Sequence, residues 1–459
     1  MSLRQPLRSA TRQSILKDFA VPAPVEGWDA STALAAMPAL RAVQLKNWFP
    51  QPGYVEVRRG YRYHAWSVGT SSSPVETLAV WRGPASSKMF AAANGHIYDV
   101  TSNAVASSSV SGLGSNRWQW INHTTSAGAY LWMCNGTDAV RHFNGSVWAT
   151  PSLTGITSTD VIQVWPHKKR IWMVPKESTA GYYLATEAVA GAATKFEFGS
   201  NFARGGYLNC VVTWTRDGGN GADDYLVAIS SQGEAAVYQG TDPATSDTWA
   251  LVGVFQLAPP IGRRCFLQYG GNVLILTQQG IIPLSQILAM DTTQSNLVAN
   301  SSRISQALTT MATAYASNWG WEMVAYPRGN RIMVNIPTLE NSAAVQYAQN
   351  VLTGAWCEFE GMNANCWVVF NDRLYFGDNT GNVYRADSGS ADIDTPITAT
   401  GQCAYQAFGS RGRIKRFSLV KPLITTTGTH RPSVGISTDF VETSNMSTAV
   451  VGTTAANAR

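Results

Sequence analysis

Charged residues are scarce in this sequence. They make up 14% of its 459 residues, well below the usual share of about a quarter. A surface with so few charges has to be covered by small polar residues or by partners, which favours a subunit of an assembly. The net charge of +5 comes from scattered residues, so we expect no sequence-specific nucleic-acid site. The two most basic stretches, 167–170 and 411–417, are each interpreted as a solvated turn or strand edge.

Long apolar runs and secretion signals are also lacking. No stretch approaches the roughly 18 apolar residues that a membrane-spanning helix needs, so we expect no membrane-spanning segment. The first residues lack the apolar core of a signal peptide. The six cysteines show no CxxC spacing and are predicted to be buried thiols in a reducing compartment. We therefore expect the chain to be made and folded in a cytoplasm.

Sequence patterns of common catalytic and metal sites are missing as well. The six histidines show none of the HxH, HExxH or HxxxH spacings of zinc sites. The sequence contains neither a GxxxxGK[ST] phosphate loop nor a GxSxG nucleophile elbow. We therefore predict no enzymatic activity, no catalytic residue, no metal ligand and no cofactor.

Paired carboxylates leave one enzymatic alternative open. Asp223 and Asp224 follow a glycine-rich loop, and Asp387 lies near Asp392 and Asp394. A glycosidase needs two carboxylates held across a cleft, whereas aspartates at strand ends and turns most often bond to the local backbone. The group of Asp387, Asp392 and Asp394 is also a candidate calcium site, although its spacing fits no EF-hand loop. The structural interpretation is preferred in both cases.

Glycine and the aromatics tryptophan and tyrosine are abundant, and they occur in a repeated pattern. The stretch FNDRLYFGDNTGNVYRAD at 370–387 is typical of a turn, a strand, a second turn and a returning strand. Asn-Gly pairs between apolar runs elsewhere predict the same tight hairpins, because both turn residues must accept positive φ. Hairpins of this kind begin at seven places: Lys88, Tyr130, Arg170, Tyr225, Asn272, Arg331 and Arg373.

These hairpins recur every 40 to 59 residues. A period near 40 to 50 residues built from strands is typical of a β-propeller, in which each blade is a four-stranded sheet. We therefore predict an all-β fold, a six- or seven-bladed β-propeller spanning 61–395. Apolar residues at helical spacing predict a short inserted amphipathic helix at 301–318, between the fifth and sixth blades. The many tryptophans are interpreted as packing between blades.

The two ends of the chain differ from the repeats. Residues 1–60 are predicted to form an N-terminal arm and a ring-closing strand that pairs with the last blade. Within them, 31–45 is predicted to be weakly helical. Residues 396–459 are predicted to form a C-terminal β unit and a small, polar tail.

Three stretches resemble a family of bacteriophage structural proteins. They are LKNWFPQPGYVEVRRGY near the N-terminus, VLTGAWCEFEGMNANCWVVFNDRLYFGDNTGNVYRADSG, and the following AYQAFGSRGRIKRFSLVKP. Their order is similar to that in the tail nozzle, tail-hub or tail-stabilisation proteins of short-tailed phages. The resemblance covers about the first 60 and the last 150 residues, and between them it rests on the propeller period.

The resemblance implies a function that the residues alone do not. It implies a propeller that forms a homo-hexameric ring at the distal tail of the virion, below the portal and adaptor proteins. Such a ring continues the DNA channel, retains the genome, lets it pass on ejection, and docks tail fibres or a needle. The protein would be made in the host bacterial cytoplasm, and DNA would pass without sequence-specific binding.

Three other functions fit a propeller sequence. A carbohydrate-binding adhesin would use aromatic rings on loops to stack on sugars. A glycosidase-like propeller would need the carboxylate pair described above. An ordinary cellular scaffold is disfavoured by the irregular blade lengths and by repeats that lack the Trp-Asp dipeptide.

Overall fold

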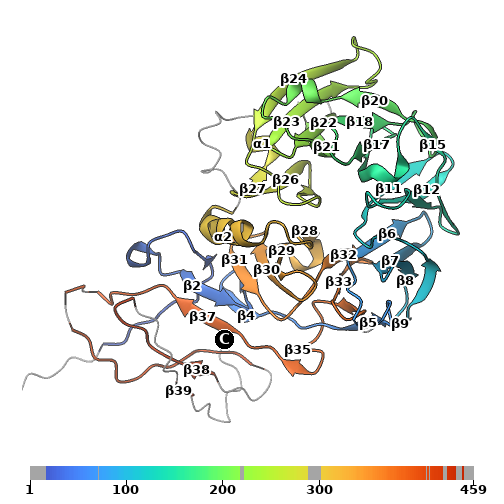
Figure 1. Ribbon diagram of the computed structural model, residues 1–459. Coiled ribbons are helices and arrows are strands. Elements are labelled where there is room, and N and C mark those ends of the chain that lie inside the picture. The colour runs from blue at the N-terminus through green and yellow to red at the C-terminus, as the bar shows by residue number, and fades with distance from the viewer. Residues whose placement is uncertain are drawn as a thin grey trace, which may run out of the picture.

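β-Sheets arranged around a common axis make up most of the molecule (Figure 1). The computed structural model describes residues 17–70, 72–217, 222–287, 301–409, 411–412, 414–426, 432–440 and 447–448. Within this part of the chain no helix is both long enough and apolar enough to cross a membrane.

The first four blades are four-stranded antiparallel sheets. Blade one consists of β6 (Thr77–Arg82), β7 (Ser87–Ala93), β8 (His96–Asp99) and β10 (Ser107–Val110). Blade two consists of β11 (Gln119–Thr125), β12 (Gly128–Cys134), β13 (Arg141–Phe143) and β14 (Trp148–Ala149). Blade three consists of β16 (Val161–His167), β17 (Arg170–Pro175), β18 (Ala180–Tyr183) and β20 (Thr194–Glu197). Blade four consists of β21 (Leu208–Asp217), β22 (Ala222–Ser230), β23 (Glu234–Gly240) and β24 (Trp249–Gln256).

The last three blades depart from this plan. Blade five has three strands, which are β25 (Phe266–Tyr269), β26 (Asn272–Thr277) and β27 (Gly280–Pro283). Blade six has β28 (Glu322–Tyr326), β29 (Arg331–Leu339), β30 (Ala343–Asn350) and β31 (Trp356–Phe359). Blade seven combines three late strands with an early one, and its strands are β32 (Cys366–Phe370), β33 (Arg373–Gly377), β34 (Val383–Arg385) and β5 (Arg62–Trp66).

The seven blades form a closed circle. Each blade contacts the next, mostly through their first strands, and β32 of blade seven contacts β6 of blade one. The antiparallel pairing of β5 with β34 places Tyr63 opposite Tyr384, and their rings lie 5.0 Å apart. The predicted propeller is therefore confirmed, with seven blades, and a strand from the N-terminal part of the chain completes the last blade.

The sequence repeat corresponds to the middle of each blade. All seven hairpin starts fall in the second strand of a blade, that is in β7, β12, β17, β22, β26, β29 and β33. The predicted positive-φ turns are present, with Asn371 and Asp372 at φ 47° and 56° and Asn94 and Gly95 at 50° and 71°. Asn371 and Asp372 connect the first and second strands of blade seven, whereas Asn94 and Gly95 connect the second and third strands of blade one. The repeat is regular because every blade keeps its first three strands.

The inserted helix is present where the sequence predicts it. A 3-10 turn, η5 (Ser302–Ile304), leads into α2 (Ser305–Tyr315), between blades five and six. Its apolar side packs on β27 and β29 through Leu308 and Ala312. The helix thereby covers blade five, which has no fourth strand.

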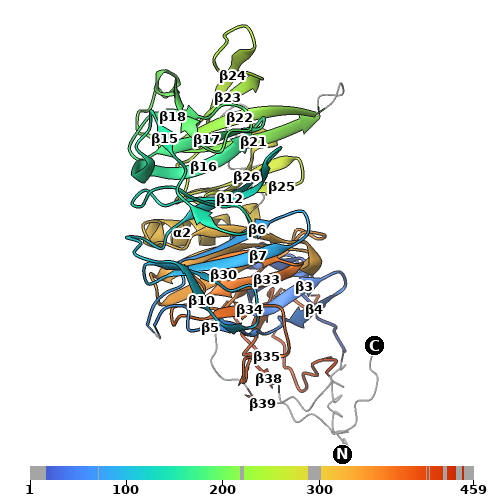
Figure 2. The ribbon, with the colours of Figure 1, turned by 90° about the vertical axis from the view of Figure 1, so that its right-hand side faces the viewer.

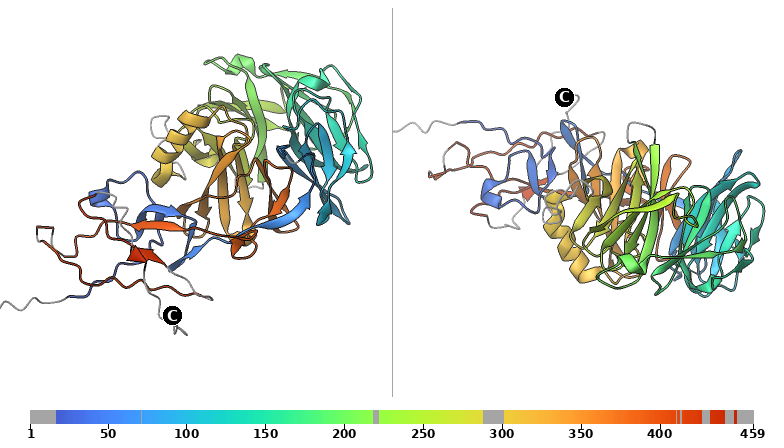
Figure 3. Two further views of the ribbon diagram at one scale, coloured as in Figure 1. Left: turned by 60° about the horizontal axis from the view of Figure 1, so that its bottom comes forward. Right: turned by 90° about the horizontal axis from the view of Figure 1, so that it is seen from above.

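The N-terminal part widens blade six. Two strands, β1 (Gly27–Trp28) and β2 (Arg41–Lys46), continue its sheet beyond β31, and β37 (Thr400–Cys403) from the other end of the chain forms the outermost strand. A hairpin of β3 (Trp48–Gln51) and β4 (Tyr54–Val57) follows. The early strands β1 and β2 and the late strand β37 thus lie together on one side of the propeller (Figure 3).

The prediction of weak helix at 31–45 is wrong. The structure has only the 3-10 turn η1 (Leu34–Ala36), and β2 follows it. Pro38 cannot donate a hydrogen bond inside a helix, and the edge of β31 offers residues 41–46 a sheet to join. Tertiary pairing therefore overrides the local preference of an alanine-rich stretch.

The structure also contains short strands and helical turns outside the main strands of the blades. The remaining strands are β9 (Ala104–Val105), β15 (Leu153–Thr154), β19 (Gly191–Ala192), β35 (Ala391–Asp392), β36 (Thr395–Pro396), β38 (Ser433–Val434) and β39 (Ser447–Thr448). The remaining helical turns are α1 (Leu284–Ile287), η2 (Ser158–Asp160), η3 (Gly199–Asn201) and η6 (Pro327–Gly329). In the region predicted as a C-terminal β unit, residues 404–426 have no helix or strand where they are described, and 427–431, 441–446 and 449–459 lie outside the described residues.

Aromatic rings fill the space between neighbouring blades. Trp172 of blade three lies 6.1 Å from Trp249 of blade four with nearly parallel rings, and Phe90 of blade one meets Phe143 of blade two at 4.9 Å. Trp172, Phe90 and Phe143 are fully or almost fully buried. The tryptophans are therefore mainly core, as the sequence predicts, and this packing holds separate sheets together.

Arg58 ties the two ends of the chain to the propeller. Its guanidinium forms two hydrogen bonds with the Asp392 carboxylate, at 2.8 and 2.6 Å, and also bonds the Glu360 carbonyl and the Asn47 side chain. Only 1% of the Arg58 side chain is exposed. The same residue thus joins the segment before β5, the end of blade six and the segment after blade seven.

Replacing Arg58 is expected to destabilise the fold strongly. Arg58→Met leaves Asp392 without its cation and removes the donor to the carbonyls of Arg59 and Glu360. We expect a loss of about 3–5 kcal/mol in the free energy of unfolding. Arg59→Met is the matched control because Arg59 is the exposed neighbour, and we expect a change within about 0.5 kcal/mol. Urea unfolding followed by tryptophan fluorescence measures both, and equal losses would contradict this role of Arg58.

A second prediction concerns pH. Burial raises the pKa of Glu358 on β31 to about 7, although Lys46 of β2 lies 3.8 Å away. The unfolded chain ionises this group at lower pH than the folded chain, so the native state loses stability as pH rises from about 4.5 through 7. Glu358→Gln removes this penalty. We expect the variant to be more stable than the unsubstituted chain by roughly 1–3 kcal/mol at pH 8, with the difference vanishing towards pH 4. A pH-independent difference in urea unfolding would refute it.

Candidate functional site

Six charged and aromatic side chains gather at one end of the propeller axis. Five of them lie just before or at the start of the first strand of a blade. The sixth, Glu340, follows β29, whose end lies beside the start of β28 because the two strands are antiparallel. We call this group the axial cluster, and its members are Glu76, Arg117, Arg264, Trp319, Glu322 and Glu340. They come from blades one, two, five and six and from the segment between α2 and β28.

Arg264 reaches across the axis. It precedes blade five, yet its guanidinium donates to the carbonyl of Trp118 in blade two at 2.9 Å and to the hydroxyl of Thr77 in blade one at 3.0 Å. In a circle of seven, blades one and two are the farthest from blade five. Because the Arg264 side chain forms hydrogen bonds to blades one and two, it must lie near the centre of the ring.

Trp319 is held between two guanidinium groups. The Arg264 guanidinium lies 4.8 Å and the Arg117 guanidinium 5.3 Å from the Trp319 ring, both within cation–π range. The Trp319 backbone N–H donates to Glu340 at 2.9 Å, and its indole N–H donates to the Glu76 carbonyl at 3.4 Å. The ring and the two cations thus form one stack at the axis.

Three carboxylates neutralise the arginines. Arg264 pairs with Glu322 at 3.2 Å, and Arg117 pairs with Glu76 at 2.9 Å and also with Glu340. Burial raises the pKa of Glu322 above its usual value even though Arg264 opposes this. Burial also disfavours ionisation of Glu340, but the hydrogen bonds from Trp319 and Arg117 outweigh it and lower the pKa. No arginine of the cluster is left to bind an outside anion.

The neighbouring Arg263 adds a second connection across the axis. It donates to the carbonyl of Asn135 in blade two at 3.2 Å, and burial lowers its pKa. Two consecutive residues of blade five thus bond to blade two. The charges of Arg264 and Arg117 are already paired with carboxylates, whereas the Arg263 guanidinium bonds to a backbone carbonyl. The arrangement can brace the ring, but it offers no free acid, base or nucleophile.

The structure does not assemble the carboxylates of the glycosidase alternative. Asp223 and Asp224 are consecutive on β22, so their side chains leave opposite faces of blade four. Asp223 accepts from Gln239, and Asp224 accepts from Thr215 at 2.7 Å. Asp387 follows blade seven on the opposite side of the circle. The geometry that glycoside hydrolysis needs is therefore not formed by these residues.

The predicted calcium ligands are also apart. Asp387 accepts from Arg331 of blade six at 3.2 Å, Asp392 is the partner of Arg58, and Asp394 is exposed beyond it. Each of the first two carboxylates is neutralised by its own arginine. In the described part of the chain no group of three or more His, Cys, Asp or Glu side chains could hold a metal ion.

The sequence also predicted a turn at 167–170 and six buried cysteines. The turn at 167–170 is confirmed, because Lys168 and Lys169 connect β16 and β17 with φ of 44° and 62°. The prediction of six buried thiols is wrong for Cys403, which is exposed on the outermost strand β37, while the other five are buried. An edge strand has no neighbour to cover it, which sequence composition does not reveal.

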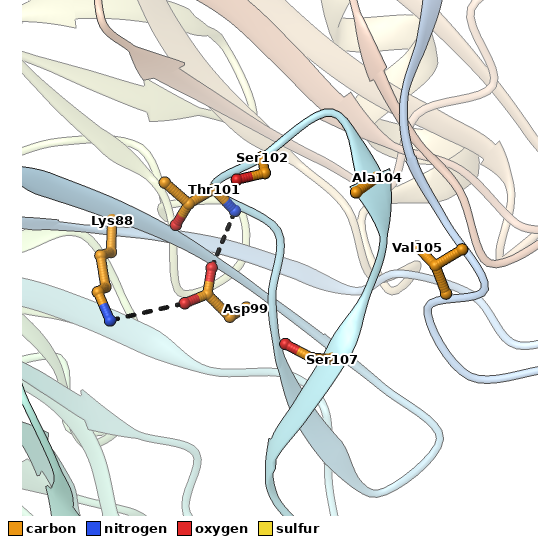
Figure 4. Close-up of a pocket in the computed structure, with 7 residues that line it drawn as sticks. All are labelled: Lys88, Asp99, Thr101, Ser102, Ala104, Val105 and Ser107. Carbon is orange, nitrogen blue, oxygen red and sulfur yellow. Dashed lines mark hydrogen bonds and ion pairs between the residues drawn. The ribbon is translucent and has the colours of Figure 1, made fainter.

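A shallow depression of about 340 Å³ lies on the outer side of blade one (Figure 4). Its two charged groups, Lys88 and Asp99, form an ion pair at 3.8 Å, and the Thr101 N–H donates to Asp99 at 3.0 Å. The depression is lined by Lys88, Asp99, Thr101, Ser102, Ala104, Val105 and Ser107. Since its charges pair with each other, it has no group poised for catalysis.

Comparison with known proteins gives similarity of fold only. No protein-family model and no curated protein matches the sequence. Among solved structures, BBS1N in complex with ARL6DN is 9% identical over 72% of this chain and 98% of that chain, with a TM-score of 0.44. Streptogramin B lyase is 10% identical over 72% and 97%, with a TM-score of 0.42. YCF48 from Cyanidioschyzon merolae is 10% identical over 71% and 98%, with a TM-score of 0.42.

Sequence reasoning missed the axial cluster. Its members are spread from residue 76 to residue 340, and each looks like an ordinary charge or aromatic at the edge of a strand. The one available signal was the adjacent pair Arg263 and Arg264 before the shortest blade. A pair of arginines has no local acidic partner there, so its partners had to come from other blades.

Removing Arg264 tests whether the cluster braces the ring. Arg264→Met leaves Glu322 as a buried carboxylate without a cation and removes the bonds to blades one and two. We expect a loss of about 3–5 kcal/mol in the free energy of unfolding. The double variant Arg264→Met with Glu322→Gln should recover part of the loss, because the unpaired charge is gone. A loss below about 1 kcal/mol with no recovery would show that the contact is unimportant.

Proposed function

We propose that this chain is a structural subunit of a virion, one of six copies that form a ring at the distal tail of a short-tailed bacteriophage. The ring continues the DNA channel below the portal and adaptor proteins and retains the genome. It lets the genome pass on ejection and docks tail fibres or a needle. The chain catalyses no reaction, is made in the host cytoplasm and ends in the virion tail.

The axial cluster is the observation that carries this proposal. Propellers that act on small ligands need open space with unpaired polar groups, whereas here Arg264 fills the centre of the ring and its charge is matched by Glu322. A braced, filled circle of blades suits a part that bears load. Viral DNA then passes between copies of the chain, since the propeller's own axis is occupied at one end.

The C-terminal segment supports an assembled state. After β37 the chain runs along one side of the molecule, away from the blades (Figure 2). It exposes large apolar side chains there, with Ile414 fully exposed and Leu419 and Leu423 more than 80% exposed. Apolar side chains on an extended segment favour burial against a partner.

The sequence resemblance supplies the specific identity of the assembly. The stretches LKNWFPQPGYVEVRRGY and AYQAFGSRGRIKRFSLVKP, which resemble the phage tail family, both belong to the side of the molecule where the chain ends lie. The segments that carry the resemblance are therefore close to the surface that we expect to meet other proteins.

Counting copies in purified phage particles tests the proposal. Quantitative mass spectrometry with isotope-labelled peptides from 161–197 and 322–359 should give six copies of this chain per particle. A particle-associated chain with a very different copy number would contradict the hexameric ring. Absence from particles would refute the tail function altogether.

A glycan array on the same purified chain separates the tail ring from an adhesin. The tail-ring proposal predicts no binding above background. Saturable binding of one class of glycan would instead assign the chain to host recognition.

A further inference from the structure

Among the residues that the structure describes, the outer strand of blade four is a sheet edge with no strand beyond it. The sequence of β24 is WALVGVFQ, which has no charged residue and no proline. Leu251, Val252 and Val254 expose 43%, 50% and 38% of their surface. A bulge at Val252 interrupts the pairing with β23. A long, apolar, unpaired edge is a template for another strand, and proteins usually protect it.

The other outer strands of the propeller carry such protection in the described residues. β10 is mostly serine, β20 carries Lys195 and Glu197, and β9 and β14 are only two residues long. β27 is covered by α2, and the edge of blade six is covered by β1, β2 and β37. Blade four thus differs from its neighbours in having an outer strand of eight residues without charge, of which all but Trp249 are at least partly exposed.

The chain also contains a segment that lacks a sheet to join. Residues 414–424, IKRFSLVKPLI, have no helix or strand, although Phe417 contacts Phe408. Ile414, Leu419 and Leu423 expose 104%, 82% and 85% of their surface. The stretch up to Val420 is free of proline and rich in residues that favour strands.

The charges of the two elements are complementary. The segment carries Lys415, Arg416 and Lys421 and no acidic residue. The turn before β24 carries Asp247 and also Asp242, which pairs with Arg170 at 3.3 Å. Opposite charges at the rim of a strand pair guide partners together and fix the register. The apolar centre and the charged ends thus match between 414–424 and the edge of blade four.

The two elements cannot meet within one chain. β24 lies at one end of the molecule and the segment that follows β37 lies at the other, in two views turned by 90° (Figures 1 and 2). We infer that residues 414–424 of one copy add as a fifth strand to β24 of a neighbouring copy. Backbone hydrogen bonds give this contact its affinity, and the apolar side chains of both strands bury one another.

This contact has a defined symmetry. Its donor and acceptor are different surfaces, so each copy binds one neighbour through its segment and a second neighbour through β24. Head-to-tail contacts of this kind generate a ring when the rotation closes. Closure at six copies rests on the proposed function above, whereas the strand addition itself rests only on the two surfaces.

Disulfide trapping tests the contact in the full-length chain. One chain carries Val252→Cys, a second carries Leu419→Cys, and both carry Cys403→Ser so that no other exposed thiol of the described residues interferes. After mixing and mild oxidation, we expect a covalent dimer of the two chains on a non-reducing gel. The matched control replaces Val252→Cys by Ser108→Cys on β10, another outer edge, and we expect no dimer. No dimer with Val252→Cys, or equal dimer with Ser108→Cys, overturns the inference.

A second variant measures the strength of the same contact. Val254→Lys places a charge on the β24 edge, and we expect it to weaken self-association by about tenfold or more in sedimentation velocity. Ser108→Lys on β10 should leave it unchanged. Near-ultraviolet circular dichroism confirms that each variant is folded. Unchanged association of a folded Val254→Lys variant contradicts the contact.

The two proposals fail separately. Trapping without six copies per particle would keep the strand addition and refute the tail ring. Six copies per particle without trapping would keep the ring and place its interface elsewhere.

Discussion

The pairing of β5 with β34 is the constraint on which the rest of the structure depends. It gives blade seven its fourth strand and closes the circle of blades, and it joins Arg62 to Arg385 across the sheet. Because one partner comes from each end of the sequence, both ends of the chain must lie outside blades six and seven. The widened sheet of blade six, the bond between Arg58 and Asp392, and the departure of the C-terminal segment all follow from that placement.

Closure of the circle also creates the environment of the axial cluster. Once seven blades are fixed, inner strand ends from distant parts of the sequence face one another across the axis, and side chains such as Arg264 reach between them. Buried charges there must be paired. Three carboxylates pair with Arg264 and Arg117 and so satisfy this requirement. The two guanidinium groups also contact the Trp319 ring. The same groups that stabilise this end of the axis use their charges within the cluster.

Local signals in the sequence predicted the parts of the fold that depend on local physics. Positive-φ turns such as the one at Asn94 and Gly95 depend on a few neighbouring residues, and they predicted the blades and their period. The apolar spacing of α2 is equally local, and it predicted the inserted helix. The strand at 41–46 was missed because two of its partners, β31 and β37, lie more than 300 positions away in the sequence. The axial cluster was missed for the same reason, since Arg264 finds its partners only after the ring has closed. The exposure of Cys403 likewise depends on which strand is outermost.

In the proposed function, a propeller whose axis is occupied at one end is a building block, and its copies surround a channel. Electron cryo-microscopy of the tail end of purified phage particles tests it most directly. We expect six copies of this chain around the channel, side-chain density filling each propeller axis at Arg264 and Trp319, and DNA density only between copies. Density of DNA passing through a propeller axis, or a tail in which this chain is not found, would contradict the account.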